Sequence, residues 1–556
     1  MATTPNPALV TQRAAQRLPR LALLLFCAAY VLPGLFGRDP WRNADITAFG
    51  YMASIAQGHS SWLAPSVGGL PADAALLPYW IGAAAIALLT PLVEPAIAAR
   101  LPFALLLVVS LAMTWYSTYH LARTDAAQPL PFAFGGEADP VDYARAVADG
   151  AVLALIATLG LLQLGHETTP ELAQLASVSI FLYAMAASPY RPRLAPLAVW
   201  GALPALAASG APAIAVALAV AGLVISVRSS YQQVRRFSVH VGLAGMLAAA
   251  TASMLGAWDY RIDLPASADD VRDTLRLFAW FTWPTLPLAA WTLWRWRLHW
   301  QKRHMAVPLA CAAVAMVASI LMGGVDRALM LALPPLAVLG AFALPTLQRS
   351  SGAAIDWFSV FFFSICALTI WVIYLAVQTG FPARPAANVQ RLLPGLQVSF
   401  SWPELMLAIA GSVAWIALVF WRTGRHRHPL WKSMVLPAGG VALCWLLLMS
   451  IWLPMLDYAR SERPLVQRVS RHLPKDRSCV AMPSQPLARI AAIEQLGGYR
   501  VDAATPLART PCDFLLRQEP KDAVDIAPPG WRLLARVRRP TERLELTAIY
   551  AREPRR

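Results

Sequence analysis

Apolar runs of about 17–22 residues recur along most of this chain, and they constrain its fold more than any other feature. A helix of about 20 apolar residues is long enough to cross the hydrocarbon core of a bilayer. Only 14% of the residues are charged, whereas about a quarter are charged in soluble proteins. The 556-residue chain is 57% hydrophobic, and we predict an all-α polytopic membrane protein.

About thirteen of these runs are predicted to be transmembrane helices. They lie at about 21–37, 101–121, 148–164, 172–187, 195–208, 212–227, 237–256, 277–294, 305–322, 328–345, 357–378, 405–421 and 433–455. A further apolar run, at about 76–92, is predicted to lie along the membrane surface in the first external loop.

The distribution of Lys and Arg decides the status of the run at 76–92. If this run does not cross, five basic loops without any acidic residue share the side of the N-terminus. They lie near 191–193, 228–236, 295–303, 349 and 422–432. Positively charged loops stay in the cytoplasm. We therefore predict a bacterial inner-membrane protein with a cytoplasmic N-terminus and a periplasmic C-terminal region, although the loop at 123–147 carries charges of both signs.

The net charge of +16 would also fit a nucleic-acid-binding protein. Because the Lys and Arg residues gather in short loops between apolar runs, membrane topology explains them. We expect membrane lipids as partners, and no nucleic acid.

The residues after about 456 are polar and Arg-rich, with short alternating runs such as SCVAMP and LELTAIY that are typical of strands. We expect a transmembrane domain at 1–455 and a small periplasmic α+β domain at 456–556. A disulfide between Cys479 and Cys512 is expected there, because the periplasm is oxidising. Two free thiols are the alternative. The sequence has no CxxC pair and no His-rich spacing, which argues against a structural zinc site.

Three carboxylates are predicted to face the periplasm near the membrane. Asp45 and Asp73 flank the first external loop, and Glu171 lies in the second. Carboxylates beside an apolar surface suit proton transfer or the binding of sugar hydroxyls. Acids also mark solvated loops, so a structural role is the alternative for each. His166 could assist proton transfer near neutral pH or be an interfacial histidine. Asp39 is expected to cap the helix that carries Asp45.

The order and spacing of several short motifs resemble the GT-C class of membrane glycosyltransferases. The likeness is to the bacterial 4-amino-4-deoxy-L-arabinose transferase and protein O-mannosyltransferase group, and it covers about 20–350. The motifs are NADITAFGYMASIAQG with Asp45, GGLPADAALLPYW with Gly69, Asp73, Tyr79 and Trp80, AARLPFALLL with Arg100, TTPELAQLASVSIF with Glu171, and GGVDRALMLALPPLAVLG with Arg327.

The chain departs from the family pattern at Ile46, where a second acid often follows the first, and at two further motifs. The Lys-Pro-Pro element expected after Asp73 is replaced by Ala74, Ala75 and Leu76. In relatives that lysine is expected to bind the lipid phosphate. A glycine preceded by lysine, between the fifth and sixth spans, appears here as Ser209-Gly210. The resemblance therefore implies that phosphate binding differs in this chain or that its activity is altered.

The resemblance implies a glycosyltransferase that moves a sugar from a polyprenyl-phosphate donor to a periplasmic acceptor by inverting displacement. The acceptor would be lipid A, another envelope glycan or a protein. Asp45, Glu171 and Asp73 would be the catalytic group, and the substrate-binding residues would be Arg100, Arg327, His166, Tyr79 and Trp80. Arginine suits bidentate contact with phosphate.

Two other functions stay open at this point. One is a non-catalytic protein that binds polyprenyl lipid or serves envelope assembly, which the missing Lys-Pro-Pro element favours. The other is a lipid or glycolipid transporter, although the charges gather at the ends of spans and not near their middle. No cofactor is implied with certainty. Three carboxylates could hold a divalent metal ion through oxygen ligands.

Overall fold

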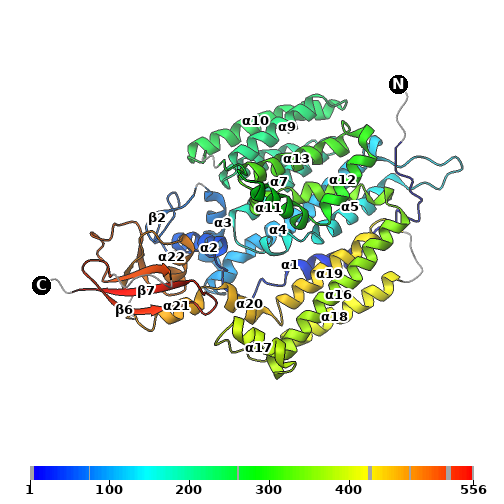
Figure 1. The fold of residues 1–556 in the computed structure, drawn as a ribbon. Helices are drawn as coiled ribbons and strands as arrows, with labels where there is room; N and C mark the ends of the chain where they lie inside the picture. The colour runs from blue at the N-terminus through cyan, green and yellow to red at the C-terminus, as the bar shows by residue number, and fades with distance from the viewer. Residues whose placement is uncertain are drawn as a thin grey trace.

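The computed structural model describes residues 6–73, 75–258, 262–423, 429–474, 478–520 and 527–553, without the side chain of Arg349. A large helical body carries a smaller sheet domain at one end, and the N-terminal segment lies at the other end (Figure 1). The predicted fold class, a polytopic α-helical membrane protein with a small C-terminal α+β domain, is confirmed by this arrangement.

After one helix in the body, the chain forms the elements that carry Asp45 and pack beside the sheet domain. These are α1 (Arg20–Val31), α2 (Ala44–Ala56), β1 (Ser66–Val67), β2 (Leu70–Pro71) and α3 (Leu76–Leu89). Asp45 stands in the first turn of α2, where a negative charge is favourable beside the positive end of the helix dipole. The residue before this helix is Asn43, with φ of 72°, so the expected cap is wrong and Asp39 lies further upstream.

The helical body follows, from α4 to α20. Its elements are α4 (Pro95–Ala122), η1 (Asp125–Ala127), α5 (Pro140–Ile156), α6 (Leu161–Leu164), α7 (Pro170–Ala187), α8 (Leu194–Ala208), α9 (Pro212–Val227), α10 (Gln232–Met254), α11 (Ala268–Phe281), α12 (Thr285–Arg295), η2 (Arg297–His299), α13 (Arg303–Leu321), α14 (Asp326–Met330), α15 (Leu333–Ala341), η3 (Leu344–Thr346), α16 (Arg349–Thr379), α17 (Ala383–Leu392), α18 (Trp402–Thr423), α19 (Lys432–Leu448) and α20 (Leu453–Arg460).

Seven helices of the described chain are long and apolar enough to cross a membrane, or eight if a bent pair counts as one span. The predicted count of thirteen is not confirmed, although each predicted run overlaps a helix. Several predicted runs form shorter or broken helices. The run at 277–294 is divided at Pro284, which lacks the N–H that would continue the helix. The run at 433–455 bends by 73° between α19 and α20, just before Pro454.

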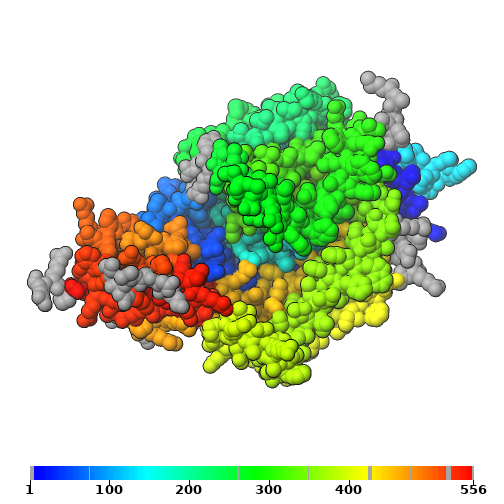
Figure 2. Space-filling view, viewed as in Figure 1, coloured from blue at the N-terminus to red at the C-terminus, as the bar shows by residue number. Residues whose placement is uncertain are grey.

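The helix α2 is held tightly between α3 and the sheet domain. A Cβ at Gly82 of α3 would lie 2.2 Å from the sulfur of Met52, and a Cβ at Gly50 would lie 2.8 Å from Ala491. Both glycines therefore permit an approach that any side chain would prevent. Figure 2 shows the sheet domain packed directly against the N-terminal surface elements.

The C-terminal region forms a mixed five-stranded sheet with two helices. Its elements are α21 (Arg463–Val469), β3 (Cys479–Ala481), α22 (Leu487–Gln495), β4 (Arg500–Asp502), β5 (Phe514–Pro520), β6 (Trp531–Val537) and β7 (Glu545–Arg552). The strand order is β4-β3-β5-β7-β6, with β3 parallel to both neighbours and β7 antiparallel to both of its own. The helix α20 runs across the predicted domain boundary at 455/456, which stays a prediction.

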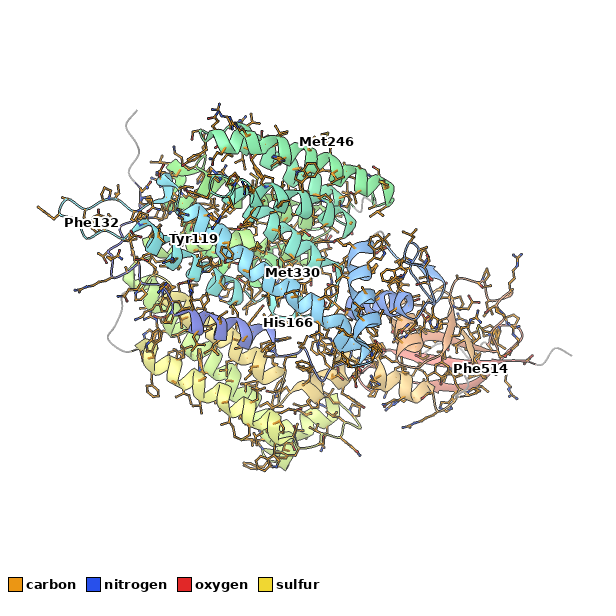
Figure 3. All side chains as sticks on the ribbon, turned by 180° about the vertical axis from the view of Figure 1, so that it is seen from behind. Tyr119, Phe132, His166, Met246, Met330 and Phe514 are labelled. Atoms are coloured by element: carbon orange, nitrogen blue, oxygen red, sulfur yellow. A yellow bond between two sulfur atoms is a disulfide. The ribbon has the colours of Figure 1, made fainter. Side chains whose placement is uncertain are left out.

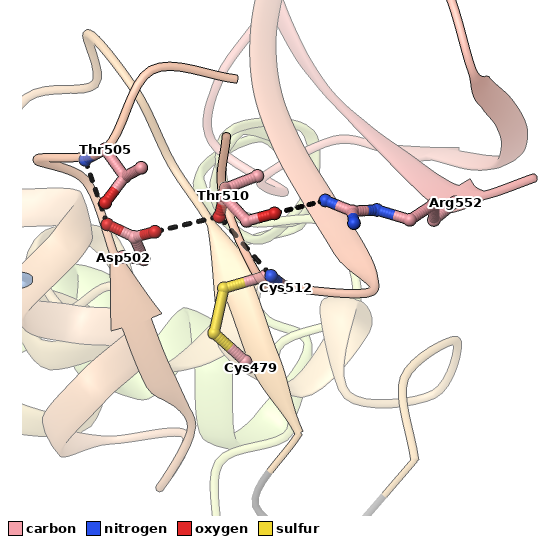
Figure 4. Close-up of a disulfide and its surroundings, with 6 residues drawn as sticks. All are labelled: Cys479, Asp502, Thr505, Thr510, Cys512 and Arg552. Carbon is pink, nitrogen blue, oxygen red and sulfur yellow. Dashed lines mark hydrogen bonds between the residues drawn. A yellow bond between two sulfur atoms is a disulfide. The ribbon is translucent and has the colours of Figure 1, made fainter. Parts of the chain in front are cut away.

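Cys479 and Cys512 form a disulfide that joins β3 to the segment before β5 (Figure 4). The same segment is held by Thr510, whose hydroxyl donates to Asp502 Oδ2 at 2.8 Å and whose carbonyl accepts a hydrogen bond from Arg552. The edge of the sheet is therefore tied by both covalent and polar contacts.

Candidate active site

The Asp45 carboxylate is enclosed by protein groups and is only 1% exposed. Its Oδ1 accepts hydrogen bonds from the backbone N–H of Thr168 at 2.8 Å and from the Thr168 hydroxyl at 2.7 Å. Its Oδ2 accepts from Arg38 Nη1 at 3.1 Å and from the backbone N–H of Trp41 at 3.0 Å. An ionised carboxylate offers about four lone-pair sites, so these bonds fill its capacity.

The electrostatic surroundings of Asp45 keep it ionised. Burial alone would raise the pKa of its carboxyl, but the nearby guanidinium groups of Arg38 and Arg100 and the Thr168 hydrogen bonds lower the pKa below its usual value. The group is therefore a fixed negative charge at the start of α2.

Arg38 is the partner of Asp45 that sequence reasoning missed. Its Nε donates to the carbonyl of Gly34 at 2.8 Å, and its Nη2 donates to the carbonyl of His166 at 2.5 Å. Its guanidinium carbon also lies 4.7 Å from the centre of the Trp41 ring, a cation–π contact. The sequence GRDPWRNAD indicates this pairing only weakly, because a basic residue after a span is equally typical of an anchor to lipid headgroups.

Arg327 lies between two glutamates, one just before α7 and one in its first turn. Its Nη2 is 2.6 Å from Glu167 Oε2, and its Nη1 is 3.5 Å from Glu171 Oε2 and 3.1 Å from the hydroxyl of Thr169. Glu167 is not among the predicted site residues, yet it is the more buried of the two glutamates, at 4% exposed. Burial and the charge of Asp45 raise the pKa of Glu167 despite the pairing with Arg327.

The segment 166–169 joins these two groups of charges. Thr168 binds Asp45, while Glu167 and Thr169 bind Arg327. His166 points back into the body: its Nδ1 lies 2.7 Å from the carbonyl of Leu162 and its Nε2 lies 2.8 Å from that of Tyr30. Figure 3 places His166 between the end marked by Phe132 and the sheet domain marked by Phe514.

His166 contacts backbone carbonyls through both of its ring nitrogens. Burial lowers the pKa of its imidazole to about 4, and this effect outweighs the two carbonyl contacts, which favour the charged form. A neutral ring can donate to only one of those carbonyls.

Arg100 is 3% exposed and lies near the N-terminal end of α4. Its Nη1 is 3.4 Å from the carbonyl of Leu35, and within the described chain its Nη2 has no hydrogen-bond partner. The residue lines a cavity of about 10 Å³ together with Gly34 and His166, which is room for about one water molecule. In this conformation Arg100 acts on Asp45 through its charge.

The remaining predicted residues lie around α3. Tyr79 is buried with its ring 5.2 Å from that of Tyr51, and Asp73 and Glu171 are both electrostatic neighbours of its phenol. Asp73 is exposed. The indole N–H of Trp80 donates to the carbonyl of Trp62 at 2.6 Å, which anchors the ring to the first external loop.

The two departures from the family motifs meet in space. Ala74 lies outside the described residues, but Ala75 approaches the loop at Gly210 so closely that a Cβ at Gly210 would lie 3.1 Å from Ala75 Cβ. The backbone carbonyl of Ser209, in the same loop, accepts a hydrogen bond of 2.7 Å from Gln174 of α7. The segment after Asp73 that departs from the family pattern therefore meets the Gly210 loop at Ala75.

A metal centre finds no support among the described residues. No group of three or more His, Cys, Asp or Glu side chains within that part of the chain could hold a metal ion. Asp45 and Glu167 already bind arginine, and their other acceptor positions face protein donors.

The fold matches solved structures, although the sequence does not match known families. No protein-family model and no curated protein sequence matches the chain. ArnT from Cupriavidus metallidurans bound to undecaprenyl phosphate superposes with a TM-score of 0.56 at 13% identity, over 95% of this chain and 96% of that one. The same protein in its apo state gives 0.57 with equal identity and coverage. The chain therefore has the fold of ArnT, and the resemblance predicted from the motifs is confirmed at the level of fold.

Proposed function

We propose that this chain is a glycosyltransferase that uses a polyprenyl-phosphate-linked sugar as donor. The acceptor would lie on the side of the sheet domain, in the periplasm, and would be lipid A, another envelope glycan or a protein hydroxyl. The observation that carries the proposal is the cluster of Asp45, Glu167, Glu171 and two paired arginines beneath the sheet domain, in a chain with the ArnT fold. The bound undecaprenyl phosphate of one ArnT structure fits the proposed donor class.

The hydrogen bonds around Asp45 favour an orienting role over a general base. A carboxylate with four filled acceptor positions would have to break one of them to take a proton. An acceptor that is already anionic, such as a phosphate, needs no base at all. Glu171 makes one long contact and is a quarter exposed, so it is the carboxylate that an acceptor hydroxyl or a sugar hydroxyl would meet.

Arg327 is the residue proposed to offset charge on the departing phosphate. Its side chain is 21% exposed and is held by Glu167 and by the 3.1 Å bond from Nη1 to Thr169. The 3.5 Å contact of Nη1 with Glu171 is long, so a phosphate oxygen could replace it. This role would compensate for the missing lysine near Ala75. Asp73 and Trp80 would border the sugar.

A non-catalytic lipid-binding protein is the second candidate, because the lysine positions are lost together and Asp45 is closed. The test is release of polyprenyl phosphate from a polyprenyl-phosphate sugar by purified protein in membranes, with crude envelope acceptors. The proposal requires release by wild type and a large loss in Glu171→Gln and Arg327→Gln. Binding of the lipid without any release, across pentose, hexose and amino-sugar donors, would support the second candidate.

A further inference from the structure

The C-terminal half of α20 and the residues that follow it contact the Asp45 loop from the opposite side. The Asp39 carboxylate accepts two hydrogen bonds from the guanidinium of Arg463 and one from the hydroxyl of Ser461 at 2.7 Å. The backbone N–H of Asp39 donates to Asp457 Oδ1 at 2.9 Å. Side chains from 457–463 therefore fix the loop 38–45 from outside.

Trp41 is the point at which these contacts meet. Its backbone N–H donates to Asp45, and its indole N–H donates to Asp457 Oδ1 at 3.1 Å. Two guanidinium groups make cation–π contacts with the ring, Arg38 at 4.7 Å and Arg460 at 5.2 Å from its centre. Two cation–π contacts to one indole ring favour a single orientation of that ring.

Arg460 also reaches the second group of charges. Its Nη1 donates to Gln163 Oε1 at 2.6 Å, and Gln163 Nε2 donates in turn to Glu167 Oε1 at 2.9 Å. Glu167 binds Arg327 through its other oxygen at 2.6 Å. The Gln163 amide can make both bonds in only one of its two orientations, so Arg460 selects the orientation in which the amide donates to Glu167.

We propose that Arg460 is a positioning residue that sets the geometry of both Asp45 and Arg327. This proposal rests on the proposed function, because that geometry would govern turnover only in an enzyme. Arg460 acts on Asp45 through Trp41 and on Arg327 through Gln163 and Glu167, and it makes no contact with either residue that the structure records. No motif in the sequence singles it out.

The first test compares Arg460→Gln and Arg460→Lys with Arg471→Gln, an exposed arginine of the same region that serves as the matched control. We expect Arg460→Gln to lower kcat about 10–100-fold with the KM for donor changed less than about 2-fold, because misplaced groups lose turnover more than binding. Lysine should recover part of the loss, since it can still donate to Gln163. Equal behaviour of Arg460→Gln and Arg471→Gln would overturn the proposal.

The second test separates positioning from general stability by a double-mutant cycle. Gln163→Leu should reduce turnover, and the double variant with Arg460→Gln should be no worse than the more affected single variant, because both act on Glu167 through one contact. Fully additive losses would contradict the connection through Gln163.

A third readout does not depend on catalysis. Hydrogen–deuterium exchange at the amides of Trp41 and Thr168, both bonded to Asp45, should accelerate in Arg460→Gln and stay unchanged in Arg471→Gln. If wild type releases no polyprenyl phosphate, the proposed function fails while the exchange result still decides the positioning role. Unchanged exchange in Arg460→Gln would refute that role even in an active enzyme.

Discussion

Asp45 and Glu171 are both acids in the first turn of a helix, yet their surroundings differ. Asp45 is closed off from solvent and accepts four hydrogen bonds from the protein. Glu171 has a side chain that is 25% exposed and a single ion pair at 3.5 Å. The first holds three segments of the chain together, whereas the second retains acceptor positions for a ligand. A motif that marks both as acids does not separate these two tasks.

The largest effect is expected from Asp45→Asn, because this carboxylate is buried in an ion pair. An amide in place of the carboxylate leaves Arg38 buried without its ion pair and directs an N–H toward existing donors. Removing one partner of a buried ion pair costs about 3–5 kcal/mol. We expect a lower midpoint of thermal unfolding and loss of turnover together. A variant that unfolds like wild type would show that Asp45 is not a structural anchor.

Arg327→Gln should have an intermediate effect on stability. It leaves Glu167, which is 4% exposed, with only the Gln163 amide as partner, and an uncompensated buried acid costs about 2–3 kcal/mol. Turnover should fall further than stability alone explains if the guanidinium meets the departing phosphate. Thermal unfolding and donor turnover measured on the same preparation separate the two losses. Loss of turnover in exact proportion to the unfolded fraction would count against a role at the phosphate.

Glu171→Gln is expected to affect turnover more than stability. Because this acid is partly exposed and its ion pair is long, the free energy of unfolding should change by less than about 1 kcal/mol. Turnover should nevertheless drop strongly if Glu171 meets the substrate. The measurement is kcat at saturating donor, with the unfolding midpoint as control. Full activity in Glu171→Gln would remove this residue from the proposed site.

The smallest effects concern pH, and they have opposite signs at the two buried acids. The pKa of Asp45 is lowered from its usual 3.8, so its contribution to stability is complete above 3.8 and is lost as the pH falls through the folded-state value. The pKa of Glu167 is raised above 4.5, so stability falls as the pH rises from 4.5 to its folded-state value. The stability gap between wild type and Asp45→Asn should shrink below pH 3.8. The gap between wild type and Glu167→Gln should shrink above pH 4.5. Parallel pH profiles would contradict both directions.

The sequence was sufficient to predict the elements whose pattern is local. The apolar runs predicted the helices, and Asp45 stands in the first turn of a helix as expected. The position of the run at 76–92 along the membrane surface stays a prediction. The disulfide and the strands of the C-terminal region followed from residue type and alternation. Span lengths were predicted less well, because Pro284 and Pro454 divide or bend helices inside continuous apolar stretches.

The partners of the predicted acids could not be read from the sequence. Arg38 binds a carbonyl 128 residues away, and Arg463 binds Asp39 across 424 residues. Such pairs depend on how the helices pack, and arginines near membranes are common for reasons of topology alone. The same limit applies to Glu167, which has no motif of its own and acquires its importance from Arg327.

The bond between Asp39 and Arg463 also has a consequence for biosynthesis. Its two partners leave the ribosome 424 residues apart, which corresponds to a delay of roughly 20–85 s at synthesis rates of about 5–20 residues per second. Until the second partner arrives, the loop that bears Asp45 lacks the contacts that fix it from outside. The order of synthesis therefore leaves the site incomplete while the helices assemble. A chain truncated before Arg463 would lack the bond that holds Asp39 in place.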